Sequence, residues 1–286
     1  MSVNRRKIQQ LQSIVLDTCT TCAVGTLFYY KPEFFNPWDL SLFQWMLGGL
    51  AIRGAINFYD HLVVFAVDSI FSQKFLPTRT TGKAVRYVDL DIQSIIFLSI
   101  NAVHEWIFVQ RLCHYIWFSP DVSLEIDDIG VSNTIGALVV MFIVLDLCYA
   151  PCHHILHMPA IYPLIHKHHH RQHFPTRGYL DAGNEHPIEH IIGVLCTWAS
   201  VLSAVHIVDA HAVVIFLFFN IHAALAMLNH SPYDVEFLGY SVANHEMHHR
   251  KFTINYSQYC MWYDHIMKTY ARYEGPTAVR IDKSKF

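Results

Sequence analysis

Long apolar stretches alternate with short polar segments along this chain of 286 residues. The apolar stretches cover about 11–30, 42–72, 92–118, 131–151 and 188–229. A run of about 20 apolar residues is long enough for a helix to cross the hydrocarbon of a bilayer. The pattern therefore predicts an all-α integral membrane bundle with about four transmembrane helices, formed by the first four stretches.

Two of these stretches are interrupted by polar residues. The stretch 42–72 contains Arg53, Asp60 and His61, so we expect this helix to be broken, tilted or partly at the membrane interface. The stretch 188–229 is split at Asp209–His211, which predicts a membrane-associated helical hairpin. The hairpin either crosses the bilayer or enters it partway, and both options return the chain to the side on which it started.

The distribution of positive charge predicts the orientation in the membrane. Segment 73–90 holds four Lys and Arg residues, segment 31–41 holds one, and segment 119–130 holds none. Cytoplasmic loops carry the excess of Lys and Arg. We therefore expect a multi-pass protein whose N-terminus, C-terminus and histidine clusters all lie on the cytosolic side, at or near the membrane surface.

Composition supports a membrane protein and excludes some other classes. Only 15% of the residues are charged, whereas soluble domains have about a quarter, and the mean hydropathy is +0.25. The net charge of -3 and the absence of a basic motif with interleaved aromatics give no reason to expect nucleic-acid binding. The seven scattered cysteines are not a disulfide framework and suit a reducing compartment.

Three histidine clusters are the strongest chemical signal. Residues three and four apart share one face of a helix, so each cluster predicts several imidazoles on one face. Crowded imidazoles are typical of a metal centre, here of two ions, although imidazole suits Fe, Zn, Cu and Ni alike. Within the second cluster, His168 would point to a different face. The clusters are His153-x3-His157, His166-x2-His169-His170 and His245-x2-His248-His249.

Further residues are candidates for completing this centre. His230 ends an apolar helix and is the first additional ligand candidate, and His222 lies two turns earlier on a similar face. His186 precedes Pro187 and suits the first turn of a helix, while Glu189 and His190 are candidates for orienting a ligand imidazole.

Asp146 and Tyr149 lie seven and four residues before His153, on the same helix face. An acid at the end of a membrane helix needs a partner. Asp146 therefore either accepts a hydrogen bond from a ligand histidine or caps the helix and faces water.

The pattern resembles the fatty acid hydroxylase/sterol desaturase superfamily, whose members include methylsterol monooxygenases, sterol C5-desaturases and cholesterol 25-hydroxylase. The matching residues run from Asp146 to Thr269, nearly half of the chain. They include Asp146-x2-Tyr149-x3-His153-x3-His157, His166-x2-His169-His170, Pro175-Thr176, His186-Pro187-x-Glu189, Asn229-His230-Ser231-x-Tyr233-Asp234, His245-x2-His248-His249, Phe252, Asn255-Tyr256 and Trp262-x-Asp264. The sequence departs from common family residues, without losing a histidine, at His154, Pro232, Glu246 and Lys268.

The resemblance implies two iron ions that activate O2, and no catalytic side chain beyond the metal centre. The apolar pattern divides the chain into a transmembrane region, 1–150, and a region woven back through the membrane, 151–286, which the resemblance identifies as the di-iron catalytic region. The resemblance and the inferred orientation imply the endoplasmic reticulum membrane. Electrons derived from NAD(P)H would come from cytochrome b5 or a NAD(P)H-dependent reductase, because the chain has no dinucleotide-binding motif of its own. The implied ligands are His153, His157, His166, His169, His170, His230, His245, His248 and His249.

Several alternatives stay open at this point. The expected reaction is hydroxylation, C4-demethylation, desaturation or epoxidation of a lipid, with a sterol or sterol precursor first and a fatty acid or sphingolipid second. A zinc hydrolase using His186, Glu189 and His190 fits an inverted H-x2-E-H motif but leaves the H-x2-HH clusters unexplained. A membrane metal transporter would place its ionisable residues along a path through the bilayer.

Overall fold

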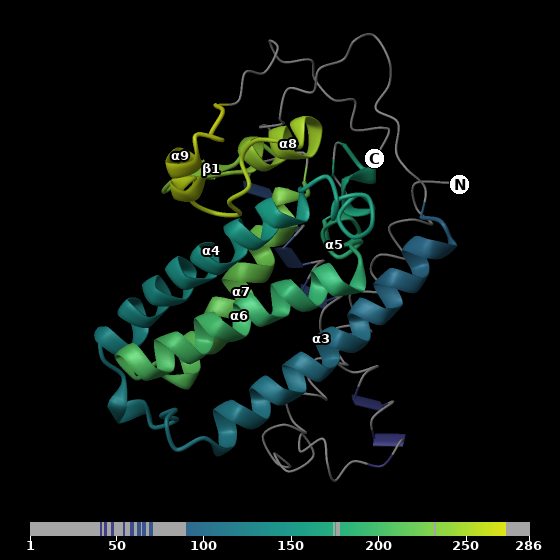
Figure 1. The fold of residues 1–286 in the computed structure, drawn as a ribbon. Coiled ribbons are helices and arrows are strands. Elements are labelled where there is room, and N and C mark those ends of the chain that lie inside the picture. Colours follow the sequence, from purple (N-terminus) through teal and green to yellow (C-terminus); the bar gives the residue numbers. More distant parts are fainter. Residues whose placement is uncertain are drawn as a thin grey trace.

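The computed structural model describes residues 90–272, apart from 174, 176, 177 and 232, together with separate positions between 41 and 70. The expected helix at about 11–30 lies outside the described residues, as does most of the one at 42–72. The described part is helical with a single two-stranded sheet, which confirms the all-α class (Figure 1).

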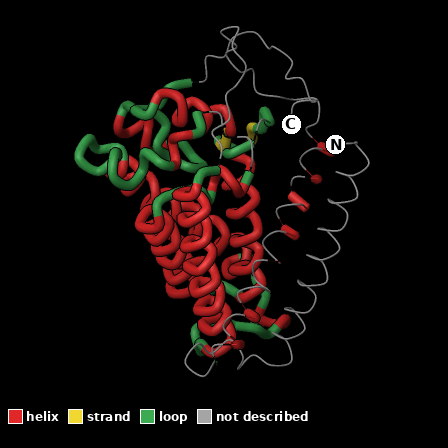
Figure 2. Tube along the Cα trace, turned by 90° about the vertical axis from the view of Figure 1, so that its right-hand side faces the viewer, coloured by secondary structure: helices red, strands yellow, loops and turns green. Residues whose placement is uncertain are grey.

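Four apolar helices form the membrane bundle. They are α3 (Ile92–Phe118), α4 (Ala137–Leu156), α6 (Pro187–Val208) and α7 (Ala212–Asn229), and a π-helical turn at Ser132–Gly136 leads into α4. Each is long and apolar enough to cross a membrane. Figure 2 shows the helices running alongside one another below a more irregular cap. The sequence placed α3 correctly, but α4 continues beyond residue 151, so its last turn carries His153, and His157 is its C-cap.

The outer surface of the bundle is apolar, as expected for a surface that faces lipid. Val139, Ile143 and Leu147, one turn apart on α4, are each about half exposed. The inner surface is tightly packed, with Met141 and Phe218 fully buried. Because lipid tails are as apolar as these side chains, close packing between helices holds such a bundle together more than the hydrophobic effect does.

The α6–α7 hairpin reaches as deep as the connection between α3 and α4. The His211 amide donates to the Asn133 carbonyl at 3.0 Å, and the Ala212 amide donates to the Ser123 carbonyl at 3.0 Å. These bonds tie the tip of the hairpin to the loop at the end of the bundle away from the histidines. Of the two options left by the sequence, this geometry favours a hairpin that runs the full depth of the bundle.

The cap is built from shorter elements. Turns follow α4, and after them come a 3-10 turn at His169–Arg171 and α5 (Tyr179–Ala182). The segment after α7 adds β1 (Glu236–Phe237), β2 (Tyr240–Ser241), α8 (Val242–Lys251) and α9 (Trp262–Met267). The second histidine cluster therefore lies in turns rather than on the regular helix that its spacing predicts.

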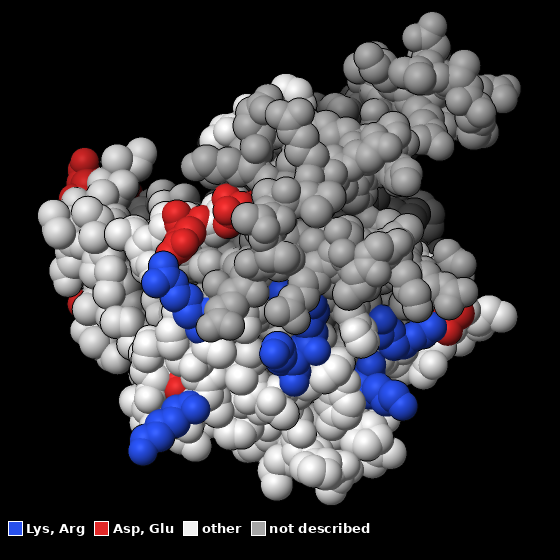
Figure 3. All heavy atoms as spheres, turned by 90° about the horizontal axis from the view of Figure 1, so that it is seen from above, with Lys and Arg blue, Asp and Glu red and all other residues white. Residues whose placement is uncertain are grey.

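The two ends of the bundle differ in charge. Figure 3 shows the cap from above, with Lys and Arg side chains spread over it and some Asp and Glu side chains beside them. The cap segments contain Lys167, Arg171, Arg250 and Lys251. The α3–α4 connection at the opposite end, residues 119–131, has acidic residues and a 3-10 turn at Ile126–Asp128 but no Lys or Arg.

Candidate metal centre

Nine histidines converge just above the bundle, in two adjoining groups. They come from the end of α4, the turns at 166–170, the end of α7 and the helix α8. In each group, the potential ligand nitrogens all lie within 4.8 Å of one another. The five-histidine group consists of His153, His157, His166, His170 and His248, and the four-histidine group consists of His169, His230, His245 and His249.

The spacing of the ring nitrogens matches that of ligands around a shared ion. In the five-histidine group, His166 Nε2 lies 3.0 Å from His153 Nε2 and 2.9 Å from His170 Nε2. In the four-histidine group, His245 Nε2 lies 3.1 Å from His249 Nε2 and 3.3 Å from His230 Nε2. Nitrogens at about 2.1 Å from one ion are about 3.0 Å apart at a right angle and about 3.4 Å apart at a tetrahedral angle.

The tautomers of several rings turn Nε2 lone pairs toward the centre of the site. The Nδ1–H of His153 donates to the Tyr256 carbonyl at 2.7 Å, and that of His248 donates to the Ile254 carbonyl at 2.7 Å. In the four-histidine group, His230 and His249 donate in the same way to the Ala226 and Gln172 carbonyls. A neutral imidazole has one N–H, so the Nε2 atoms of these four rings carry lone pairs.

The rings are held in the neutral form that a metal needs. Burial, with the neighbouring imidazoles adding to it, holds the pKa of His166, His170 and His249 well below the usual value. The same causes lower the pKa of His157, at the edge of the site. Lone pairs of neutral rings that face one another at about 3 Å repel unless a cation lies between them, so the residues present fit a pair of bound metal ions.

Glu189 contacts the five-histidine group from the first turn of α6. His186 caps this helix by accepting from the Ile188 amide at 3.2 Å, with Pro187 as the first helical residue. The cap directs the buried Glu189 carboxylate to His166, whose Nδ1–H donates to Oε1 at 2.7 Å. The geometry is that of a carboxylate that orients a ligand imidazole.

His190 and His186 do not join the site. His190 Nδ1 pairs with Glu185 at 2.8 Å, and its ring stacks on His104. Among the residues described by the structure, no group able to hold a metal contains His186 or His190. The inverted zinc motif is therefore not assembled, and the expectation that His190 orients a ligand is wrong.

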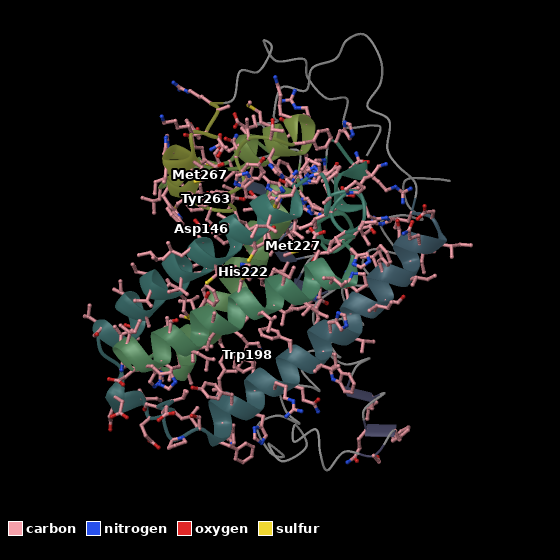
Figure 4. All side chains as sticks on the ribbon, viewed as in Figure 1. Asp146, Trp198, His222, Met227, Tyr263 and Met267 are labelled. Atoms are coloured by element: carbon pink, nitrogen blue, oxygen red, sulfur yellow. The ribbon has the colours of Figure 1, made fainter. Side chains whose placement is uncertain are left out.

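Asp146 also differs from the expectation that it bonds to a ligand histidine. Its carboxylate accepts from the Cys260 amide at 2.8 Å and the Tyr259 amide at 3.3 Å, and so anchors the segment before α9 (Figure 4). The side chain of Tyr149 lies beside the site, with its ring 5.2 Å from that of His153.

His222 lies outside both groups. Its Nδ1 is hydrogen-bonded to the Tyr259 hydroxyl, and its ring stacks on Phe218 within the bundle (Figure 4). The two turns that separate it from His230 place it about 12 Å lower along an α-helix, below the level of the metal site.

Sequence reasoning gave no role to one buried acid, Asp264. It is fully buried and accepts from the backbone amides of Tyr256 and Ser257, each at 2.8 Å. It thereby fixes the carbonyl of Tyr256, to which His153 donates. The Trp262-x-Asp264 motif was the available signal, but backbone carbonyls as acceptors leave no trace in a sequence.

These features define a class of protein, a helical membrane protein whose cap holds two adjoining histidine groups built for metal ions. Comparisons with known proteins agree. The model of the fatty acid hydroxylase family matches residues 138–269, a stretch that contains all nine histidines. This match and the curated relatives support the fatty acid hydroxylase/sterol desaturase superfamily, and they indicate an O2-dependent oxidoreductase.

The chain is similar to three curated proteins. It is 21% identical to the C-4 methylsterol oxidase erg25 of Schizosaccharomyces pombe over 85% of each chain. It is 27% identical to the methylsterol monooxygenase erg25B of Aspergillus fumigatus, over 79% of this chain and 81% of the relative. It is 34% identical to the fatty acid hydroxylase ahd1 of Mycosarcoma maydis, over 39% of this chain and 27% of the relative. No solved structure matches the chain.

Proposed function

We propose that this protein uses two iron ions to oxidise a membrane lipid with O2, and that the lipid is a sterol or a sterol precursor. One ion would be held by the five-histidine group and the other by the four-histidine group. The observation that carries the proposal is the convergence of histidine Nε2 atoms at distances of 2.9–3.4 Å. Iron bound there would supply the reduction of O2 and the oxidation of an unactivated C–H bond.

The protein's own residues would hold and shield this centre. The backbone carbonyls of Tyr256 and Ile254 fix the tautomers of His153 and His248, and Glu189 fixes that of His166. Burial of the rings excludes water from the ligands. The site lies where the apolar helices meet the polar cap, so a lipid can reach it from the bilayer while a soluble donor approaches from the water.

For a hydroxylation, RH, O2, two electrons and two protons give ROH and water. The electrons must come from outside the chain, and the resemblance to the superfamily favours cytochrome b5 or a NAD(P)H-dependent reductase. The charge difference between the two ends of the bundle supports a cytosolic cap, because Lys and Arg lie on the cap and acidic residues at the opposite end. The resemblance favours the endoplasmic reticulum membrane.

A sterol is favoured by the relatives that match along most of the chain. Both of these carry names that refer to methylsterols, and they cover at least 79% of this chain. The second candidate is a fatty acid or sphingolipid, because the relative with the highest identity of the three is named a fatty acid hydroxylase, although it matches over only 111 residues.

The other two alternatives have less support. A zinc hydrolase would need His186 and His190 to converge, and the structure holds them on different partners. A transporter would need metal-binding residues along the bundle, whereas the nine histidines gather at one end of it.

The experiment that tests the proposal compares sterol and fatty-acid profiles in cells with the gene, without it, and with His248→Ala in its place. Accumulation of one sterol precursor in the last two strains supports the sterol assignment. Accumulation of an unmodified fatty acid or sphingolipid would transfer the proposal to the second candidate. Iron content of the purified protein is measured in parallel, and protein that binds no iron would overturn the proposal as a whole.

A further inference from the structure

The apolar helix α3 carries a polar face toward the cap. Asp91, Ser94, Asn101 and His104 lie on one side of it, and Ser94 and Asn101 are at most 1% exposed. Polar side chains on a membrane helix are costly and are kept where they have partners. This helix lies outside residues 138–269, the part that matches the family model.

The main partner of this face is His168, the histidine in the second cluster that does not point into the metal site. His168 Nε2 lies 2.9 Å from Asn184 Oδ1 and 3.3 Å from Ser94 Oγ. The Asn184 amide donates in turn to Ser94 Oγ at 3.3 Å. Phe97 packs edge-on against the His168 ring, with ring centroids 4.8 Å apart.

The protonation of His168 is opposite to that of the ligand candidates. The amide oxygen of Asn184 can only accept, so the Nε2 of His168 carries the proton. Its Nδ1 lies 3.5 Å from a guanidinium nitrogen of Arg171 and carries the lone pair. His153 and His248 have the proton on Nδ1 and the lone pair on Nε2. His168 therefore acts as a hydrogen-bond donor at the atom with which the others would bind metal.

The same face of α3 also holds the segment that leads to Glu189. The Asn101 amide donates to the Gly183 carbonyl at 3.1 Å and to the Glu185 carbonyl at 2.9 Å. These bonds fix the start of α6, from which Glu189 reaches His166. One side of α3 thus contacts both the segment that carries His166, His169 and His170 and the segment that orients His166.

We propose that His168 is a positioning residue that, with Asn184, fastens the second histidine segment to α3. The proposal rests on the proposed function in that the fastened segment supplies ligands to both iron ions. His166 and His170 belong to the five-histidine group and His169 to the four-histidine group, so a movement of this segment disturbs both sites at once.

The need for such a fastening follows from the conformation of the segment. Residues 158–168 form turns and residues 169–171 a short 3-10 turn, so regular helical hydrogen bonds do not hold the histidines in place. Metal ligands have to be held within about 0.5 Å of their productive positions. Contacts outside the segment must supply that restraint, and His168 provides one from the centre of the cluster itself.

The experiment measures how fast iron leaves the purified protein in the presence of a chelator, for His168→Ala, His168→Gln and Lys167→Ala. We expect His168→Ala to lose iron roughly 10–100-fold faster than the parent protein, the usual cost of losing a residue that orients metal ligands. His168→Gln keeps an N–H near the position of Nε2 and should restore most of the retention. Lys167→Ala changes an exposed neighbour in the same segment and should leave the rate unchanged.

A double variant tests the contact itself. Asn184→Ala should accelerate iron loss as His168→Ala does, and combining the two should add little, because both remove one interaction. Fully additive effects, or a His168→Ala protein that releases iron as slowly as Lys167→Ala, would overturn the proposal. A His168→Gln protein with fewer bound iron ions than the parent would also overturn it, since that result would make His168 a ligand.

Hydrogen exchange on metal-free protein keeps this test separate from the proposed function. In His168→Ala, amides 168–171 should exchange faster while amides within α8 stay as protected as in the parent. If the parent protein binds no iron but His168→Ala still shows this local change relative to it, the result would contradict the proposed function and support the fastening. Unchanged exchange at 168–171 would contradict the fastening whatever the metal content.

Discussion

The two H-x2-HH clusters have the same spacing and are built in different ways. His245, His248 and His249 lie on the regular helix α8, whose backbone fixes their relative positions. His166, His169 and His170 lie in turns that end in a short 3-10 segment, and they depend on α3 and on Glu189 for support. The difference shows that a histidine motif specifies which atoms meet at the metal, whereas neighbouring elements decide how firmly they are held.

The largest expected effect is loss of one ligand from either cluster. His169→Ala in the turn and His248→Ala on α8 should both abolish product formation while leaving membrane insertion intact. Each variant removes a ring from one of the two groups. Product analysis and iron content measure the result. Turnover retained in both variants would rule out these ligand assignments.

Acid should affect both clusters alike, because it protonates the imidazole rings themselves and does not depend on the contacts that hold each cluster in place. Burial holds the pKa of His169, His170, His245 and His249 well below the usual value in the folded protein. The unfolded chain therefore takes up more protons below about pH 6.5, and the free energy of unfolding falls as the pH decreases. Thermal unfolding of metal-free protein should show full stability above pH 6.5 and a steep loss below it, and a flat profile would contradict this.

The third expected effect, from loss of Glu189, is confined to the cluster that lies in turns, His166, His169 and His170. Glu189→Ala removes the acceptor of the His166 Nδ1–H and should lower iron affinity or turnover roughly 10–100-fold. Glu189→Gln keeps an acceptor oxygen and should recover part of the loss. Iron titration of the two variants distinguishes these cases. Equal losses in both would show that the carboxylate charge, rather than its hydrogen bond, is required.

The smallest effect concerns Asp264, which fixes the carbonyl that accepts from His153 on α4. Asp264→Asn replaces one of the two oxygens that accept from the Tyr256 and Ser257 amides with an N–H donor. A lost hydrogen bond to a charged group costs about 1.5–3 kcal/mol, so thermal stability in detergent should fall by that order. Iron retention should change less than in Glu189→Ala, because the regular helix α4 still positions His153, and α8 still positions His248 and His249. A larger loss of iron in Asp264→Asn than in Glu189→Ala would contradict the difference between the clusters.

Much of the fold and the central histidines could be predicted from the sequence. The apolar run at 92–118 coincides with α3, and the nine histidines chosen from spacing and resemblance are the nine that the structure brings together. Helical spacing was misleading at His166–His170, because turns can place residues three and four apart side by side as well as a helix can.

The supporting contacts could not be predicted for physical reasons. The two roles predicted for Asp146 were a bond to a ligand histidine and a helix cap facing water, yet it accepts from Tyr259 and Cys260, more than a hundred residues away in sequence. The acceptors of His153 and His248 are backbone carbonyls, which every residue has and which no residue type signals. The role proposed for His168 depends on its contact with Ser94 of α3, and an apolar stretch does not show which distant residue its few polar side chains contact.

The inward-facing lone pairs of the metal site have a consequence for the life of the protein in the cell. Bringing these neutral rings together without a cation costs free energy, and a bound cation returns it, so metallation and folding are linked. At a constant rate of synthesis, the iron supply should therefore set the amount of folded protein in the membrane that escapes degradation. Cells starved of iron would lose the protein itself, in addition to its activity, and would regain it only by new synthesis.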